Sequence, residues 1–288
     1  SGNTGGSEGP HLHFEFRDNK TEKIINPLFF GIQTLDTKNP IVSSLLVYPI
    51  DNTTIVNESK RPVILNLSLQ QDGTYLSQQV FASGKIGFGI SATDNDNVSY
   101  NANGIYKTQL ISNGKVIFGY EFDTMVFDEA RYINAFIDYS RYKKMYQRVQ
   151  KLYMKNPFSW SNIYQNYENG IINVTPNTLE IQRIEVSDFF KNKTVITIPV
   201  KYSAKPALIK EDVKVTKYLV KSKVESNFEK DNFSVYFPAE TFYEDFYLNF
   251  EVKNNTLFLH DDTVPAHSNF TISVEDAKST EEEKKKMF

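Results

Sequence analysis

Hydrophobic and polar residues alternate over short stretches in most of the chain, and turn-forming residues separate these stretches. The strand-like runs include "SSLLVYPI", "RPVILNLSL", "KIGFGISATD", "LEIQRIEVSD" and "KTVITIPVKY". A period of two is typical of β-strands with one buried face. Because the runs are short and follow one another closely, they predict antiparallel sandwich or barrel domains, and the chain is expected to be mainly β.

One pair of runs carries a strong turn signal. "YKTQLI" and "KVIFGY" are joined by Ser112, Asn113 and Gly114. Asn and Gly tolerate positive φ, which the tight turns of β-hairpins require. These residues therefore predict a hairpin.

A different period interrupts the strands. In "DYSRYKKMYQRVQKLYMKN", apolar side chains recur every three or four residues, at Tyr139, Tyr142, Tyr146, Val149 and Tyr153. This spacing predicts a helical insertion near 139–155 that lies on the sheet. The Lys and Arg residues between them favour a solvated face over contact with an acidic polymer.

Two breaks divide the chain into three parts. "DTKNP" at 36–40 and "SAKPA" at 203–207 interrupt the strand pattern. The predicted parts are a short unit at 1–35, a β-sandwich domain at 39–203 and a second β-rich domain at 204–288. In the short unit, a strand from Leu12 to Phe16 is followed by "INPLFF", where Pro27 stops regular pairing.

Composition and charge exclude several classes of function. The 288 residues carry a net charge of −3 and no cysteine. The charge gives no general attraction to nucleic acid or to anionic lipid, so neither is expected as a partner. Without cysteine, a transition-metal site must use His, Asp or Glu. No apolar run approaches the roughly 18 residues that a transmembrane helix needs, and the pattern does not indicate an oligomeric state.

Two of the four histidines, His11 and His13, lie one residue apart on the predicted strand. Alternate residues of a strand face the same side, so the two imidazoles are expected about 7 Å apart on one face. This arrangement suits one imidazole on a metal and the other near a metal-bound water or a substrate oxygen. An exposed strand without a metal has the same spacing, and the pair alone does not decide between them.

The residues around the pair narrow the choice. They are, in order, Gly2, Thr4, Gly5, Gly9, Pro10, His11, Leu12, His13, Phe14, Glu15, Arg17, Ile25, Asn26, Pro27 and Leu28. This string resembles the last motif of the lysostaphin-like (LytM-type) zinc endopeptidases, which cleave peptide cross-links in bacterial peptidoglycan. The resemblance implies that His13 is a zinc ligand and that His11 is catalytic, bonding the reacting carbonyl or its oxyanion. Glu15 is either a partner that orients an imidazole or a surface carboxylate.

The family's site also needs a His and an Asp from an upstream His-x-x-x-Asp motif and a further catalytic His. Only ten residues precede His11. We therefore expect 1–35 to be the remnant of an exported peptidase domain, with the export signal in the missing part. The fragment alone is expected to bind no zinc tightly and to be inactive, whereas the full protein is the zinc enzyme.

The rest of the chain resembles the β-rich extension of envelope-associated members of this family and, more generally, immunoglobulin-like bacterial surface domains. The resemblance implies a location in the bacterial cell envelope, in the periplasm or at the surface, with peptidoglycan peptide stems as partner. The alternative is a non-catalytic envelope module of immunoglobulin-like domains that binds cell-wall polymer or a protein.

Three further stretches contain side chains that could bind a metal or a ligand, but their spacing matches no known binding motif. "LFLHDDTVPAH" contains His260, Asp261, Asp262 and His267, and is read as a loop. "ATDNDN" at 92–97 has oxygen ligands of the calcium type without EF-hand spacing, and is read as a solvated turn. "DTMVFDEARYINAFIDY" at 123–139 suits either a glycan groove or an aromatic core, and the core is favoured.

Overall fold

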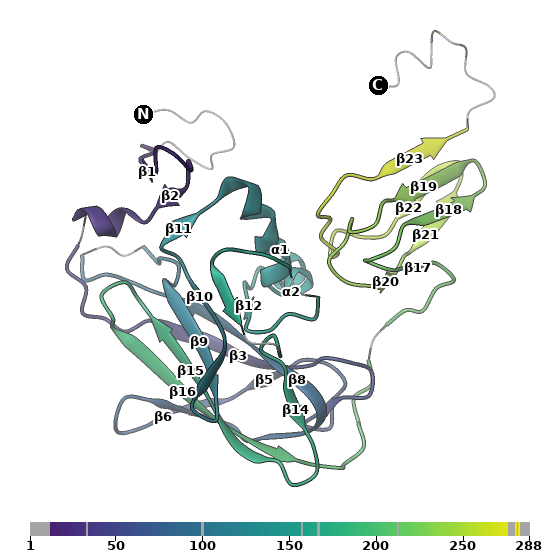
Figure 1. Ribbon diagram of the computed structural model, residues 1–288. Coiled ribbons are helices and arrows are strands. Elements are labelled where there is room, and N and C mark those ends of the chain that lie inside the picture. Colours follow the sequence, from purple (N-terminus) through teal and green to yellow (C-terminus); the bar gives the residue numbers. More distant parts are fainter. Residues whose placement is uncertain are drawn as a thin grey trace. The chain divides into compact units, whose positions relative to one another are not determined.

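The computed structural model is mainly β, as the alternating pattern predicts (Figure 1). It describes residues 12–32, 34–98, 101–156, 158–165, 168–211, 213–275, 280 and 282. The chain forms two compact units. Unit 1 comprises 1–131 and 150–209, and unit 2 comprises 132–149 and 210–288.

Unit 1 contains sixteen of the strands that the structure describes. They are β1 (Phe16–Arg17), β2 (Ile24–Ile25), β3 (Ile41–Pro49), β4 (Ile55–Val56), β5 (Val63–Leu65), β6 (Leu67–Leu69), β7 (Tyr75–Ser77), β8 (Val80–Thr93), β9 (Lys107–Ser112), β10 (Lys115–Glu121), β11 (Thr124–Met125), β12 (Gln150–Lys151), β13 (Ile163–Gln165), β14 (Ile172–Val174), β15 (Leu179–Ser187) and β16 (Lys193–Tyr202).

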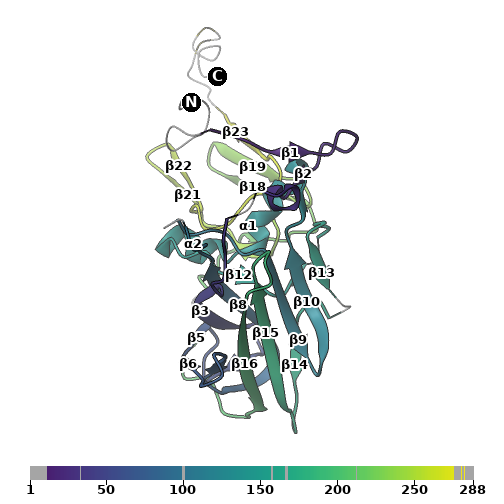
Figure 2. The same cartoon turned by 90° about the vertical axis from the view of Figure 1, so that its left-hand side faces the viewer.

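One large sheet dominates this unit. Its main strand order is β13-β10-β9-β15-β16-β8-β3-β5, and Figure 2 shows β10, β9, β15 and β16 side by side. The long strand β8 also pairs with β4, β12 and β14, so it is shared between several parts of the sheet. The β8–β16 pair is parallel, whereas the β15–β16, β9–β15 and β3–β8 pairs are antiparallel.

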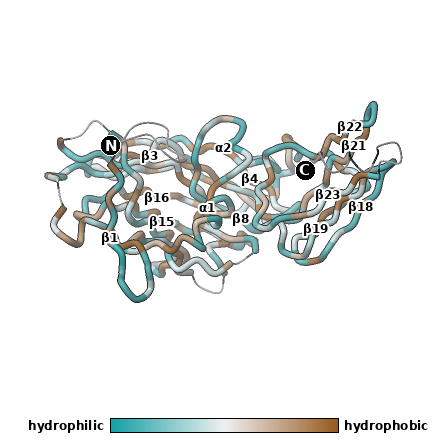
Figure 3. Tube along the Cα trace, turned by 90° about the horizontal axis from the view of Figure 1, so that it is seen from above, coloured by the Kyte–Doolittle hydropathy of each residue, from teal (hydrophilic) through white to brown (hydrophobic). Residues whose placement is uncertain are grey.

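The period of two in the sequence becomes one buried face. Along β16, Ile196, Ile198 and Val200 are fully buried, and the residues between them are partly buried. On the neighbouring strand β15, Ile184 and Val186 are buried as well. Hydrophobic and hydrophilic residues interchange along the strands in Figure 3 for this reason.

The hairpin predicted at Ser112 to Gly114 is confirmed. Strands β9 and β10 pair antiparallel, with Lys115 opposite Ser112. Asn113 has φ of 49° and Gly114 has φ of 75°, both in the left-handed region. These dihedrals match the twist of the flanking strands, which is why Asn-Gly is favoured there.

A separate small sheet holds the start of the described chain. Its strand order is β1-β2-β11, with Phe16 opposite Ile25 and Thr124 opposite Ile25 on the other side. The strand next to the histidine motif therefore belongs to a sheet that includes a strand more than one hundred positions further along the chain. The aromatic rings of Phe16 and Phe30 stack with centroids 4.0 Å apart.

Unit 2 contains both α-helices and seven strands of the described chain. They are α1 (Ile133–Phe136), α2 (Tyr139–Met145), β17 (Leu219–Val220), β18 (Ser226–Lys230), β19 (Phe233–Phe237), β20 (Phe246–Tyr247), β21 (Phe250–Lys253), β22 (Thr256–Leu259) and β23 (Thr271–Val274). Three small sheets have the orders β17-β20, β18-β19-β23 and β21-β22. Their core is an aromatic and aliphatic cluster around Val235, Phe237 and Phe250.

The helical segment is shorter than the expected 139–155. The side chain of Asp138 accepts a hydrogen bond from the Arg141 amide and caps α2, which ends at Met145 because Tyr146 adopts a left-handed conformation with φ of 56°. Beyond it, Gln150 and Lys151 pair with β8 as β12. The apolar spacing therefore continues across a short helix and a short strand.

Candidate functional site

The histidine motif lies at the start of the described chain. His11 falls outside the described residues, so its position is not part of this description. His13 precedes β1, and its side chain is 73% exposed. Its Nε2 lies 3.4 Å from Oε2 of Glu15. The two side chains are therefore on one face, as expected for residues two apart in an extended chain.

Glu15 is held by more than the imidazole. The guanidinium of Arg17 donates a hydrogen bond of 2.5 Å from Nε to Oε1 of Glu15. This bond, with a smaller contribution from His13, lowers the pKa of the Glu15 carboxyl below its usual value. A carboxylate kept ionised in this way can accept a hydrogen bond from the imidazole and fix its orientation.

The second half of the motif is anchored to strand β11 and the residues before it. The backbone N–H of Asn26 donates to the Asp123 carbonyl at 2.8 Å, and the Asn26 amide donates to the Phe122 carbonyl at 3.3 Å. The Asn26 side-chain oxygen accepts from the Leu28 amide at 3.1 Å and caps a 3₁₀ turn at Pro27–Phe30. Proline suits the first position of such a turn, because its missing N–H would have no partner there.

The described residues supply one implied zinc ligand and one carboxylate partner. A zinc site of the lysostaphin-like type takes three protein ligands. The residues from 12 onward that the structure describes bring together one group of three or more ligand side chains, and it does not include His13. The described residues alone therefore do not complete a zinc site.

That group consists of three aspartates in unit 1. Asp36 lies in the segment before β3, Asp94 directly follows β8, and Asp188 directly follows β15. One carboxylate oxygen of each lies within 4.8 Å of the other two. We call Asp36, Asp94 and Asp188 the acidic triad.

Hydrogen bonds fix two members of the acidic triad. Asn192 donates to both oxygens of Asp188, from its backbone N–H at 2.8 Å and from its side-chain amide at 2.6 Å. The same amide donates to the backbone carbonyl of Asp36 at 3.2 Å. The Lys38 amide donates to Oδ1 of Asp36 at 3.0 Å. The turn between β15 and β16 thus holds Asp188 and the segment before β3 together.

Asp94 is the buried member. It is 6% exposed, its backbone pairs with Asn103 in both directions, and its Oδ1 is buried without a hydrogen-bond partner. Burial, with the negative charges of Asp36 and Asp188, raises the pKa of Asp94 to about 6. Instead of the solvated turn expected at 92–97, the chain places a carboxylate in the interior. The sequence shows that 92–97 contains possible oxygen ligands. That Asp36 and Asp188 lie close to Asp94 follows only from the folding of the sheet.

The remaining histidines have structural partners. Nδ1 of His260 accepts a hydrogen bond of 3.1 Å from the Asn249 amide. The ring of His267 stacks on Tyr132 with centroids 5.1 Å apart, and its Nδ1 lies 2.9 Å from the Tyr243 hydroxyl. Asp262 pairs with Lys143 at 2.6 Å. The side chains at 260–267 thus stabilise the fold of unit 2, as the loop interpretation expects.

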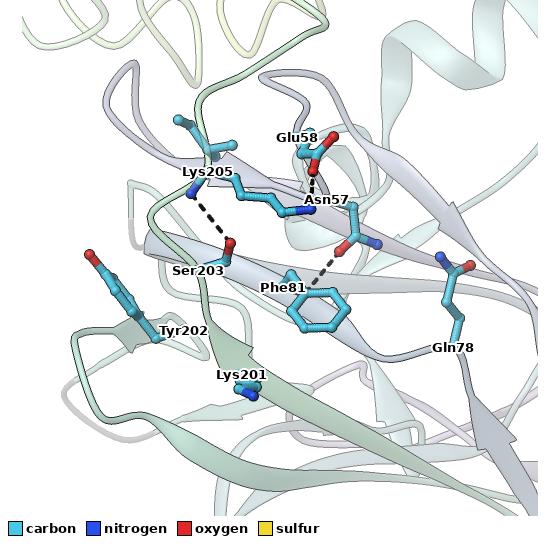
Figure 4. A pocket seen from close by; sticks show the side chains of 9 residues that line it. Asn57, Glu58, Gln78, Phe81, Lys201, Tyr202, Ser203 and Lys205 are labelled. Carbon is cyan, nitrogen blue, oxygen red and sulfur yellow. Dashed lines mark hydrogen bonds and ion pairs between the residues drawn. The ribbon is translucent and has the colours of Figure 1, made fainter.

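A pocket of about 410 Å³ opens beside the ends of β4, β8 and β16 (Figure 4). It is lined by Ile55, Asn57, Glu58, Gln78, Phe81, Lys201, Tyr202, Ser203 and Lys205. Glu58 and Lys205 form an ion pair of 2.7 Å, and Phe81 is 43% exposed. Nδ2 of Asn57 is buried without a hydrogen-bond partner. The pocket therefore offers an aromatic face next to polar groups.

Comparison with known proteins gives one family match. The model of the Zu5-like domain matches residues 217–288, which lie within unit 2. No curated protein and no solved structure gives a significant match to this chain. The helices in the described part of the chain lack the length and the apolar composition of a membrane-spanning segment.

Proposed function

We propose that this chain is the C-terminal part of an exported zinc endopeptidase that hydrolyses the peptide cross-links of bacterial peptidoglycan. The observation that carries the proposal is the ordered string from Gly2 to Leu28 around His11 and His13. Its rare residue types occur in the order of the lysostaphin-like motif. The other protein ligands would come from sequence before Ser1, and the site of action would be the cell envelope.

The contacts around His13 support this proposal. A metal-binding histidine is commonly oriented by a carboxylate on its other ring nitrogen. Glu15 lies 3.4 Å from the imidazole, and Arg17 keeps its carboxylate ionised. His13 would hold the metal through the imidazole, and Glu15 would set the direction of the ring.

His11 would act on the substrate. Bound zinc would supply a Lewis acid and an activated water in such a site. In this role the imidazole of His11 donates a hydrogen bond to the scissile carbonyl, and the bond strengthens as negative charge develops on that oxygen. Pairing of β2 with β11, together with the hydrogen bonds of Asn26, would hold the segment that carries His13 in place within unit 1.

A second candidate function is non-catalytic binding of cell-wall polymer by unit 1. The pocket beside β4, β8 and β16 favours it, because an exposed aromatic ring next to amide and ion-pair groups suits a sugar or peptide stem. In this case, the histidine motif would be an ordinary exposed strand. The two candidates are distinguished by zinc and by turnover.

The test uses the full gene product, with zinc content measured by elemental analysis and cleavage measured on purified peptidoglycan. We expect about one zinc per chain, lost in His13→Ala. His11→Ala should keep the zinc and lose most of the cleavage, typically a hundredfold or more for a lost transition-state hydrogen bond. Asp128→Asn, which changes an exposed carboxylate of unit 1 outside the motif, is the control and should keep both zinc and cleavage.

Zinc content unchanged by His13→Ala would overturn the peptidase proposal. If the parent protein binds no zinc and shows no cleavage, but sediments with insoluble peptidoglycan, the binding function is supported instead.

A further inference from the structure

The strongest unassigned feature is the acidic triad. Its members come from three segments far apart in the sequence, and the fold brings one carboxylate oxygen of each within 4.8 Å of the others. Three carboxylates this close repel one another when ionised, and burial of Asp94 adds the cost of removing its charge from water. A nearby positive charge would offset both costs and stabilise the ionised carboxylates.

The surrounding side chains do not supply that charge. In the part of the chain that the structure describes, no Lys or Arg forms an ion pair with a member of the acidic triad. The side-chain ammonium of Lys38, two residues after Asp36, donates a hydrogen bond of 2.7 Å to the backbone carbonyl of Asp96. The hydrogen bonds given to Asp36 and Asp188 come from backbone and amide N–H groups.

Asp94 gives the second, independent observation. Its Oδ1 is buried and lacks any hydrogen-bond partner, although the residue is only 6% exposed. Buried polar atoms are nearly always paired, and an ion or a water can supply the partner of an unpaired carboxylate oxygen. This oxygen belongs to the carboxylate that lies among those of Asp36 and Asp188.

We propose that Asp36, Asp94 and Asp188 bind a calcium ion. All three groups are hard carboxylate oxygens, which Ca²⁺ prefers, whereas Zn²⁺ favours nitrogen and sulfur ligands. Two oxygens on opposite sides of a calcium ion, each about 2.4 Å away, lie about 4.8 Å apart, and this spans the observed spacing. Ca²⁺ also accepts irregular coordination from separate chain segments, whereas Mg²⁺ requires near-octahedral geometry and usually retains several waters.

The site would fasten one particular segment. Asp36 lies in 34–40, the stretch between the small sheet at the start of the chain and β3. Asp94 and Asp188 lie at the ends of β8 and β15 in the large sheet. A shared calcium ion would therefore tie the segment 34–40 to two strand ends. The proposal concerns unit 1 and holds whether or not the chain is part of a peptidase.

The test is calcium binding by this chain after treatment with EDTA, measured by isothermal titration calorimetry and by thermal unfolding. We expect one Ca²⁺ site with a Kd in the range of about 10⁻⁵ to 10⁻³ M, the weaker end of protein calcium sites. Calcium should raise the unfolding temperature of unit 1 and slow hydrogen exchange in 34–40, and magnesium at the same concentration should do neither.

Asp94→Asn keeps the size of the side chain and removes the charge, so it should weaken calcium binding at least tenfold while circular dichroism shows a folded protein. Asp188→Asn is the second variant, in case the first unfolds. Asp128→Asn, an exposed aspartate of unit 1 outside the triad, should bind calcium like the parent.

No calcium-dependent shift at about 5–10 mM calcium, which is roughly five to ten times the weakest expected Kd, would overturn the site. So would unchanged binding by folded Asp94→Asn and Asp188→Asn, or tighter binding of magnesium than of calcium.

Discussion

Hydrogen bonds with backbone groups fix the position of individual side chains in this protein. His260 shows this: its backbone has φ of 51°, and its Nδ1 accepts a hydrogen bond from the Asn249 amide. The ring also lies 5.0 Å from that of Phe246, edge to face. An imidazole in these contacts is a neutral acceptor, and burial lowers its pKa below the usual value.

This pKa shift predicts acid sensitivity of unit 2. Below the ordinary histidine pKa, the unfolded chain binds a proton that the folded chain does not, so stability is full at neutral pH and falls as the pH drops. His260→Asn, which tolerates positive φ and does not titrate, should reduce the loss of thermal stability between pH 7 and pH 5. A pH dependence of unit 2 equal to that of the parent would contradict this assignment.

At the scale of elements, a glycine in a strand lets an aromatic side chain pack directly on the large sheet. Gly87 lies in the middle of β8, opposite Tyr48 of β3. A Cβ atom there would lie 2.3 Å from Cδ1 and 2.5 Å from Cγ of Tyr153, whose ring is nearly buried. The base of an aromatic ring cannot move aside as a long flexible side chain can, so this glycine permits the packing of Tyr153 against the sheet.

Gly87→Ala should therefore lower the free energy of unfolding by about 1–3 kcal/mol, the usual cost of overpacking a core. Gly104→Ala is the control, because its Cβ would meet nothing within 4 Å. Urea denaturation of the two variants measures the difference. Equal stability would show that Tyr153 can move without cost.

The hairpin, the helix and the acidic triad differ in how well they can be predicted from the sequence. Asn113 and Gly114 specify a hairpin locally, and the structure contains it. The helix predicted at 139–155 is too long, because apolar spacing does not record the cap at Asp138 or the left-handed Tyr146, which limit α2 to Tyr139–Met145. The acidic triad was missed because its three aspartates meet through pairing of distant strands, and no local period records such pairing.

For the molecule as a whole, the two units are not consecutive pieces of the chain. Residues 132–149 lie between two parts of unit 1 in the sequence but belong to unit 2, together with 210–288. Tyr132 carries part of this connection, since its ring stacks on His267 and lies 6.4 Å from that of Tyr243. Lys143 of α2 adds the ion pair with Asp262. Unit 2 is therefore built from an insertion and a C-terminal region together.

Tyr132→Ala should lower the stability of unit 2 by about 1–3 kcal/mol, since it removes a stacked aromatic contact and its buried area. Hydrogen exchange should become faster in β19 and β21 and remain unchanged in β3 and β8. Met145→Ala, an exposed change in the same segment, serves as the control and should leave both units as they are. Equal acceleration in both units would contradict the division.

The small β1-β2-β11 sheet has a consequence for how such a protein can be divided or recombined. A gene fusion that replaced all residues before the segment 34–40 would remove β2 and leave β11, Thr124–Met125, without its strand partner. It would also leave the Asp123 carbonyl without the amide of Asn26. A segment that keeps the small sheet intact must therefore extend beyond Met125, although the break at 36–40 suggests a boundary much earlier in the sequence.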